Sequence, residues 1–236
     1  GLMWFDTPML MTKNQSIELR DFVHSIQPNC IVSGRIGNGI GEYCSTSDNF
    51  IPSLPQKMDW EAPATLNGTW GFKYNDKSWK NPIDILGLLL RINSRGGNYL
   101  LNVGPDATGI VPNKCIDTLL KVGEYIRNNS DSIYNTIPVP LYSYDIRWAV
   151  FTARPYTLYI HILDDRIDIN LPCFNTKILK CEVDNNEIDF IQHKPESHSL
   201  SRFMCKLRPK KENELARLIK LTLQEEEMVF DDISKL

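Results

Sequence analysis

The sequence has few histidines and no closely spaced pair of cysteines. Its four histidines are scattered, and none of its six cysteines forms a Cys-x-x-Cys pair. Zinc sites are built from clusters of these residues, so a zinc site is unsupported, and we expect neither a metal nor a cofactor. The sequence does not decide whether a disulfide forms; the pair that could form one most easily is Cys173 with Cys181, across a turn.

Long hydrophobic runs and an excess of one charge are also missing. The chain contains no apolar stretch of the length that spans a bilayer. Its net charge is −3, with both signs mixed along the chain, so no basic face indicates a nucleic-acid partner. We therefore expect no membrane span and no nucleic acid, and we expect partners that are small or neutral.

The length of the chain allows one large domain or two modest ones. It has 236 residues, of which 42% are hydrophobic. It begins with Gly1 inside a predicted strand, without an initiator Met, a polar lead-in or a signal peptide. A core strand normally has neighbours on both sides, so we expect a cut chain with an exposed edge at Gly1.

The first 136 residues predict alternating strands and helices. Apolar residues at helical spacing predict helices over residues 14–27, 82–94 and 114–129, and short buried runs predict strands over residues 1–6, 30–33 and 98–103. Such alternation indicates a parallel sheet or barrel. Residues 34–63, rich in Gly, Ser, Asp and Pro, predict a long loop, and loops of that length are usually functional or disordered.

The pattern changes after Pro138 to short strands separated by turn signals, which favours a β-sandwich. The composition of residues 215–223 suits strand or helix, and we place strand slightly ahead. The boundary near residues 137–141 gives predicted domains of residues 1–137 and 138–236. The predicted strands cover residues 147–152, 158–163, 167–171, 178–183, 187–192, 202–207 and 215–223.

Two carboxylates stand out in the first predicted domain. Asp6 ends the run Leu2-Met3-Trp4-Phe5, and ligands bind at the C-terminal ends of parallel strands; alternatively, Asp-Thr-Pro simply starts a turn. Glu61 lies within Trp-Glu-Ala-Pro, and an apolar setting favours the protonated acid. Two carboxylates in unlike environments are the pattern of glycoside hydrolysis.

Tryptophans in the same domain fit a sugar site, because the C–H faces of sugars pack against aromatic rings. Any single one of them is nevertheless better explained as a core residue. The four are Trp4, Trp60, Trp70 and Trp79.

Several motifs in order give the chain a resemblance to a known family. They are Met3-Trp4-Phe5-Asp6-Thr7-Pro8, residues 31–35, residues 60–67, Thr69-Trp70-Gly71-Phe72, residues 96–105, residues 109–112, and residues 123–125 through 133–134. The chain resembles the second half of a family 29 glycoside hydrolase, a retaining α-L-fucosidase, closely over the first 137 residues and loosely beyond. The resemblance implies an α/β fold, a partial (β/α)8 TIM-like barrel followed by a small antiparallel β-sandwich domain.

The resemblance also implies catalytic roles. Asp6 matches the nucleophile that forms a covalent fucosyl-enzyme intermediate, and Glu61 matches the acid/base of members with a similar Trp-Glu motif. The position of the acid/base varies within the family, so Asp48 and Glu42 remain alternatives. We favour Glu61 because burial between Trp60 and Pro63 would favour its protonated form.

Three further residues match positions that bind the sugar. Arg35 falls where the family has an arginine that contacts the sugar, and Trp4 and Trp70 match aromatics of the pocket. By this resemblance Trp70 packs against the methyl group of fucose.

The implied function is hydrolysis of terminal α-L-fucosyl residues of glycans. The sugar-binding histidines of the family come from earlier barrel strands, and no histidine here lies in a matching motif. We therefore expect this chain alone to be inactive or poorly folded. The alternative is that the protein is a non-catalytic relative that binds fucose. The sequence does not decide whether the protein forms an oligomer.

Three glycosylation sequons, at Asn14, Asn67 and Asn128, are compatible with a secreted, lysosomal or periplasmic protein. Asn67 lies within a matched motif, where we expect steric blocking.

Overall fold

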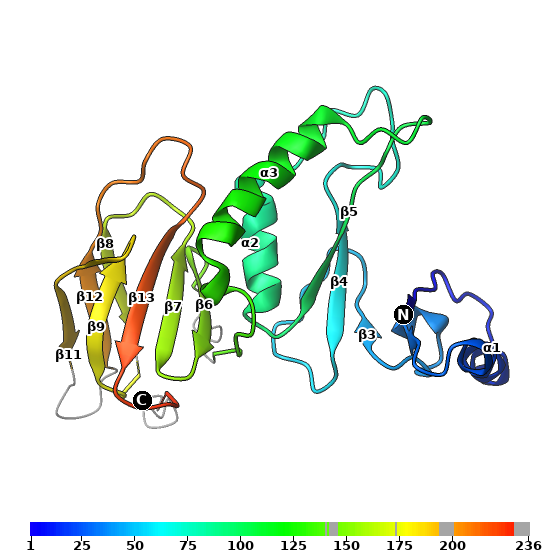
Figure 1. The fold of residues 1–236 in the computed structure, drawn as a ribbon, viewed down its shortest axis with the longest axis horizontal. Coiled ribbons are helices and arrows are strands. Elements are labelled where there is room, and N and C mark those ends of the chain that lie inside the picture. Colours follow the sequence, from blue (N-terminus) through cyan, green and yellow to red (C-terminus); the bar gives the residue numbers. More distant parts are fainter. Residues whose placement is uncertain (140, 142–145, 173, 194–200, 229–236) are drawn as a thin grey trace.

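The computed structural model describes residues 1–139, 141, 146–172, 174–193 and 201–228. It divides into a mixed N-terminal region and an all-strand C-terminal region (Figure 1). The N-terminal elements are β1 (Leu2–Met3), α1 (Lys13–Ile26), β2 (Ile31–Val32), the 3-10 helix η1 (Gly34–Ile36), β3 (Cys44–Ser45), β4 (Trp60–Thr65), α2 (Pro82–Asn93), β5 (Asn98–Asn102), α3 (Asn113–Asn128) and the 3-10 helix η2 (Ser130–Ser132).

All three predicted helices are confirmed, and local sequence explains where they begin. Thr12 and Gln15 form a capping box before α1, in which each side chain accepts a hydrogen bond from the other residue's backbone N–H. Asn81 and Asp84 do the same for α2, which has Pro82 in its first turn. These caps satisfy backbone donors that the first helical turn leaves unpaired.

The strands of the N-terminal region pair in parallel, as the alternation predicts. β1 pairs with β2, a parallel bridge joins Ser33 to Tyr43, and β3, β4 and β5 form a three-stranded sheet in that order. Among the described residues, β1 pairs only with β2. The edge at Gly1 is therefore exposed, as expected.

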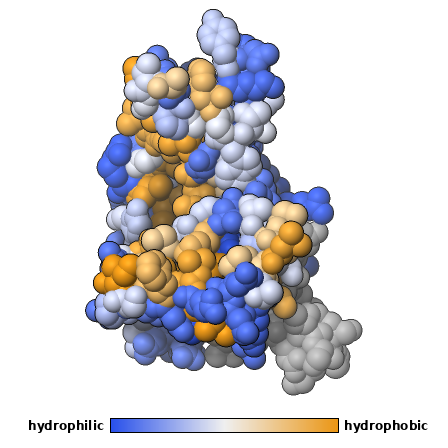
Figure 2. Space-filling view, turned by 90° about the vertical axis from the view of Figure 1, so that its right-hand side faces the viewer, coloured by the Kyte–Doolittle hydropathy of each residue, from blue (hydrophilic) through white to orange (hydrophobic). Residues whose placement is uncertain are grey.

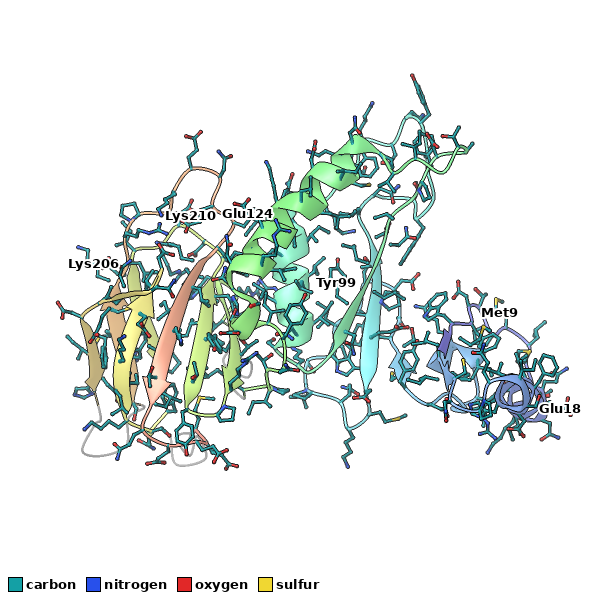
Figure 3. The ribbon with its side chains drawn as sticks, viewed as in Figure 1. Met9, Glu18, Tyr99, Glu124, Lys206 and Lys210 are labelled. Carbon is teal, nitrogen blue, oxygen red and sulfur yellow. The ribbon has the colours of Figure 1, made fainter. Side chains whose placement is uncertain are left out.

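Helices cover one face of β4 and β5. α2 and α3 lie on the same side of these strands (Figure 1), and Trp60 and Ala62 of β4 pack with Ile92 of α2. Tyr99 of β5 extends toward α2 on this covered face (Figure 3). Because side chains alternate along a strand, Glu61 lies on the opposite face, which we call the open face.

The first strand is shorter and more exposed than predicted. It has two residues, and Leu2 is 54% exposed. Apolar surface accordingly faces the viewer on the N-terminal side of the molecule (Figure 2). The apolar composition was a misleading sign of burial here, because β1 has a described neighbour on one side only.

The predicted loop over residues 34–63 is also only partly correct. It contains η1 and β3, and β4 begins within it at Trp60. A two-residue strand is too short to give a period-2 pattern, so the sequence did not reveal β3.

The C-terminal region consists of antiparallel strands in two sheets. One sheet has the order β10-β9-β13-β7-β6 and the other β11-β12-β8. The strands are β6 (Ala149–Arg154), β7 (Thr157–Ile162), β8 (Asp168–Pro172), β9 (Ile178–Val183), β10 (Asn186–Glu187), β11 (Phe190–His193), β12 (Arg202–Lys206) and β13 (Arg217–Leu223).

Side chains from both sheets form one core. Phe151, Ile160 and Ile219 of the larger sheet belong to the same buried cluster as Ile169 and Phe203 of the smaller one. The strand prediction for residues 215–223 is confirmed, whereas residues 187–192 contain the separate strands β10 and β11. Cys173, the predicted partner of Cys181, lies outside the described residues.

A buried polar network joins the two regions. The hydroxyl of Tyr125 in α3 lies 2.8 Å from Nδ1 of His161 in β7, and Thr152 of β6 donates to the carbonyl of Ser132 at 2.6 Å. Both His161 and Thr152 are fully buried. The exact boundary between the predicted domains stays a prediction. None of the described helices is long and apolar enough to cross a membrane.

Candidate active site

Asp6 and Arg35 meet where two neighbouring parallel strands end. Asp6 follows β1, and Arg35 lies in η1 directly after β2. Arg35 Nη1 donates to Asp6 Oδ1 at 2.9 Å, and the backbone N–H of Thr7 donates to the same oxygen at 2.9 Å. Both donors use Oδ1, so neither of them holds Oδ2.

Arg35 also binds the segment that follows β3. Its Nη2 donates to the carbonyl of Thr46 at 2.9 Å and to Asp48 Oδ1. The side chain of Arg35 is 16% exposed, against 56% for Asp6 and 46% for Asp48. One guanidinium therefore orients two carboxylates, as expected of its fork of fixed donors.

Glu61 forms the second part of the cluster. Its Oε1 accepts hydrogen bonds from Trp4 Nε1 at 2.6 Å and from the Tyr43 hydroxyl at 3.2 Å. Glu61 is 8% exposed. As with Asp6, both described donors bind the same carboxyl oxygen, and neither of them binds Oε2.

Trp4 connects the two carboxylates. Its ring lies under the guanidinium of Arg35, 5.2 Å from the ring centroid to Cζ, while its Nε1 holds Glu61. A cation–π contact of this kind contributes roughly 0.5–2 kcal/mol. These contacts form one continuous set. We call it the carboxylate cluster, and it consists of Trp4, Asp6, Arg35, Tyr43, Asp48 and Glu61.

The burial of Glu61 has a different cause from the one expected. Trp60, its neighbour in sequence, lies on the covered face, where it is 1% exposed and packs against Gly97. The surroundings of Glu61 are instead Trp4 and Tyr43 on the open face. Strand alternation separates residues that are adjacent in sequence, so the Trp-Glu-Ala-Pro motif identified the buried acid for an incorrect reason.

Electrostatics explain the protonation of Tyr43 and Arg35. Burial raises the pKa of the Tyr43 hydroxyl, and the charge of Glu61 and the hydrogen bond to it raise it further. Burial by itself would lower the pKa of Arg35, but its hydrogen bonds and charge pairing with Asp48 and Asp6 raise it overall. Tyr43 therefore remains a hydrogen-bond donor and Arg35 remains a cation near neutral pH.

Two glycines allow the backbone to bring these residues together. A Cβ on Gly41 would lie 2.4 Å from Gly34 Cα, and a Cβ on Gly34 would lie 2.7 Å from the Tyr43 carbonyl oxygen. No side chain fits between backbones at such distances. The close approach brings η1, which contains Arg35, against the segment that leads into β3, which contains Tyr43.

Two of the predicted residues lie apart from the carboxylate cluster. Glu42 Oε2 accepts a hydrogen bond from the backbone N–H of Val32 at 2.7 Å and lies 3.5 Å from His24 of α1. Trp70 follows β4, and its carbonyl accepts a hydrogen bond from Asn102 Nδ2 at 2.6 Å. Among the described residues, no hydrogen bond or ring contact joins either side chain to the cluster.

The segment of Trp70 is nevertheless tightly held. Trp70 has a φ of 62°, and Gly104 approaches the backbone of residues 70–72 so closely that a Cβ would lie 2.8 Å from Gly71 C. The Asn67 side chain donates to the Gly71 carbonyl at 2.9 Å and is buried at 4% exposure. This burial agrees with the expected blocking of the Asn67 sequon.

Sequence reasoning missed Tyr43 and Ser33. The Ser33 hydroxyl accepts a hydrogen bond from the backbone N–H of Phe5 at 3.0 Å, and its interaction with the Tyr43 hydroxyl partly offsets the rise in the pKa of that hydroxyl. The available signal was the Gly41-x-Tyr43 spacing inside the predicted loop, since Gly often marks close backbone approach. Of the predicted tryptophans, Trp60 belongs to the core and Trp79 packs partly buried, whereas Trp4 is in the cluster.

The arrangement has the parts needed for acid–base and nucleophilic chemistry at a sugar. One carboxylate is paired with a guanidinium and the other is buried against neutral donors, which is the pairing of unlike acids used by glycosidases. Among the described residues, no group of three or more His, Cys, Asp and Glu is placed to hold a metal ion.

Comparisons with known proteins find similarity to α-L-fucosidases. The family model for α-L-fucosidases matches residues 1–131. An α-L-fucosidase of Dictyostelium discoideum is 31% identical over 148 residues, covering 58% of this chain and 32% of that protein. The tissue α-L-fucosidase of Rattus norvegicus is 29% identical over 159 residues, covering 62% of this chain and 34% of its own. The chain thus spans about a third of the length of these relatives.

Solved structures show the same similarity at the level of the fold. The α-L-fucosidase from Vibrio sp. strain EJY3 superposes with a TM-score of 0.85 at 23% identity, over 97% of this chain and 42% of that one. The α-L-fucosidase isoenzyme 1 from Paenibacillus thiaminolyticus gives a TM-score of 0.79 at 28% identity, over 95% of this chain and 58% of the other.

Proposed function

This chain belongs to the α-L-fucosidase family, and from that premise we propose that its protein hydrolyses terminal α-L-fucosyl residues of glycans with retention of configuration. The supporting observation is the carboxylate cluster, in which Arg35 orients Asp6 while Trp4 and Tyr43 hold Glu61. The proposed fold context is a partial (β/α)8 barrel with a C-terminal β-sandwich.

Asp6 is the proposed nucleophile. Arg35 and Thr7 both bind Oδ1, so Oδ2 attacks the anomeric carbon and forms a covalent fucosyl-enzyme ester. The guanidinium counters the carboxylate charge before attack and fixes the direction of approach. The bond between the anomeric carbon and the leaving oxygen breaks as the ester forms.

Glu61 is the proposed acid/base. In the first step it gives a proton to the leaving oxygen, and in the second it takes a proton from the water that cleaves the ester. Two inversions at the anomeric carbon give overall retention. The low exposure of Glu61 supports this role, and Trp4 and Tyr43 fix the position of its carboxyl group.

The alternatives to Glu61 fit less well. Asp48 is paired with the same guanidinium that binds Asp6, whereas Glu61 is held by neutral donors. Glu42 is engaged by Val32 and faces His24. Arg35 and Trp4 are proposed to contact the sugar, and Trp70 to border the pocket against the fucose methyl group.

A fucosylated glycan is the proposed substrate, and a secreted, lysosomal or periplasmic location is proposed with it. The exposed side chains of Asn14 and Asn128 are compatible with glycosylation in a secretory pathway.

The test measures hydrolysis of an aryl α-L-fucoside. It uses variants of the longest protein that the gene encodes, and residues 1–236 are assayed in parallel. We expect Asp6→Ala and Glu61→Ala each to lower turnover by on the order of 10³-fold or more. Asp48→Ala and Glu42→Ala are the matched carboxylate controls. An Asp48→Ala loss that equals the Glu61→Ala loss would move the acid/base role to Asp48.

Azide separates the two roles by product stereochemistry. In Asp6→Ala, azide replaces the nucleophile in a single inversion and gives the β-fucosyl azide. In Glu61→Ala, azide attacks the ester formed on Asp6 and gives the α-fucosyl azide. A wild-type protein that binds fucose without turnover, and an Asp6→Ala variant that binds equally, would favour the non-catalytic relative instead.

A further inference from the structure

Two cysteines of the C-terminal region lie on opposite sheets. Cys181 is in β9 of the larger sheet, where it pairs with Leu221, and Cys205 is in β12 of the smaller sheet, where it pairs with Ile169. Cys181 is fully buried, and Cys205 packs partly buried against the same core cluster. Their side chains therefore enter one core from its two facing layers.

The two thiols interact across this core. The interaction with Cys205, together with burial, raises the pKa of the Cys181 thiol. Both are free thiols. The other described cysteines pack elsewhere: Cys30 against α1, Cys44 beside Trp60, and Cys115 in the cluster around α2 and α3.

We propose that Cys181 and Cys205 form a disulfide that ties the two sheets together when a low-molecular-weight disulfide such as oxidised glutathione is present. Both side chains enter the same core from facing sheets, and a disulfide bridges Cβ atoms that lie about 3.5–4.5 Å apart. A disulfide between the two layers of a β-sandwich core is a known way of stabilising that architecture.

The exchange proceeds in two balanced steps. Cys205, the more accessible thiol, loses its proton and attacks oxidised glutathione, which breaks the glutathione S–S bond and releases one glutathione thiolate. The Cys181 thiolate then attacks Cys205 Sγ, forms the new S–S bond and releases the second glutathione thiolate. The two protons lost by the protein are taken up by the two glutathione thiolates, so glutathione is reduced as the cysteines are oxidised.

The cross-link closes a loop of roughly 25 residues, and it limits the conformations of the unfolded chain. We expect the midpoint of thermal unfolding to rise by roughly 5–10 °C on oxidation. The bond lies within the C-terminal region, so it requires no change in the carboxylate cluster.

The experiment treats the reduced chain with oxidised glutathione, alkylates the remaining thiols under denaturing conditions, and maps the peptides by mass spectrometry. We expect the loss of two thiols and a linked peptide pair containing Cys181 and Cys205, both reversed by a reductant. A Cys173→Ser background removes the neighbouring cysteine that could compete for Cys181. Cys205→Ser should abolish both the linked pair and the rise in the unfolding midpoint, and Cys44→Ser is the control that keeps both.

Three results would overturn the proposal. They are alkylation of both cysteines after oxidation, a linked pair between Cys181 and any residue other than Cys205, and an oxidised form that unfolds at the same temperature as the reduced form. Cys181→Ala provides a second check, because it leaves Cys205 able to form only a mixed disulfide with glutathione.

Discussion

The parallel N-terminal region and the antiparallel C-terminal region use apolar side chains differently. In the C-terminal region, residues such as Leu158, Phe203 and Ile219 form one continuous core between two sheets. In the N-terminal region, the buried residues fall into separate smaller clusters, and Leu2, Ile31 and Leu100 remain exposed by 40% or more.

The difference separates the largest apolar core from the carboxylate cluster, to which we assign the chemistry. The carboxylate cluster lies on the open face, where donors, charges and a close glycine contact fix the side chains. The C-terminal region contains the largest single cluster of buried apolar residues, and the burial of apolar surface is the main favourable contribution to folding. We expect substitutions in the two regions to separate effects on stability from effects on activity.

The largest effect on stability is expected from the C-terminal core. Phe203 is 1% exposed and packs against both sheets and Phe190. Phe203→Ala should lower the free energy of unfolding by about 3–5 kcal/mol, because it leaves a cavity. Urea unfolding measures this. Ile191→Ala is the control, because this residue lies on the adjacent strand and is 61% exposed. An equal loss in the free energy of unfolding in this variant would contradict the assignment of stability to the buried core.

A smaller loss of stability with a large loss of activity is expected at Gly41. The added methyl of Gly41→Ala would collide with the Gly34 backbone at 2.4 Å. We expect a cost of roughly 1–3 kcal/mol from overpacking, with a fall in kcat/KM as Arg35 and Tyr43 shift. Gly87→Ala in α2, where the nearest atom lies at 3.8 Å, should preserve activity. Unchanged kcat/KM in Gly41→Ala would show that the glycine contact does not position the cluster.

The junction between the regions should make stability depend on pH. Burial lowers the pKa of His161 to about 3 from an ordinary value of 6.5. Between pH 6.5 and pH 3, His161 is protonated in the unfolded chain but stays neutral in the folded chain. Its contribution to the free energy of unfolding therefore falls as the pH falls from 6.5 toward 3. At pH 5.5 the expected loss is about 1.4 kcal/mol.

Urea unfolding at pH 7 and pH 5.5 measures the effect of His161. The His161→Gln variant should lose this part of the pH dependence, whatever its stability at pH 7. His24→Gln, which alters a histidine on α1, should retain it. An identical pH dependence in His161→Gln and in the parent chain would rule out the histidine as its source.

Tyr43→Phe should have an effect on activity with little effect on folding. It removes one of the two described donors to Glu61 Oε1, and a neutral hydrogen bond of this kind contributes about 0.5–1.5 kcal/mol. We expect a loss of about threefold to tenfold in kcat/KM. Tyr134→Phe, at an exposed position, should leave kcat/KM unchanged.

The smallest effect is expected at the exposed first strand. Leu2→Ala removes a side chain that is 54% exposed, and such surface substitutions usually change stability by less than about 0.5 kcal/mol. Thermal unfolding of residues 1–236 tests this. A loss above 2 kcal/mol would mean that Leu2 is buried in the folded protein in solution.

The elements that the sequence predicted well have strong local signals. Helices α1, α2 and α3 have apolar periodicity and recognisable caps, and β13 was correctly placed as a strand. The errors fall where local signals are short or misleading, as in β3 with two residues and in the apolar β1 with its exposed side chains. Of the predicted site residues, Trp4, Asp6, Arg35 and Glu61 come together, and their catalytic and binding roles stay predictions.

The sequence by itself determined the three helices, the strands with a clear apolar pattern, the family resemblance and the two carboxylates, because these depend on residue type and spacing along the chain. Only the tertiary structure decided which side chains meet. Glu61 faces Trp4 and Tyr43 rather than Trp60, because a strand sends successive side chains to opposite faces. Cys181 and Cys205 likewise enter one core, because two sheets pack face to face and bring together strands that are distant in sequence.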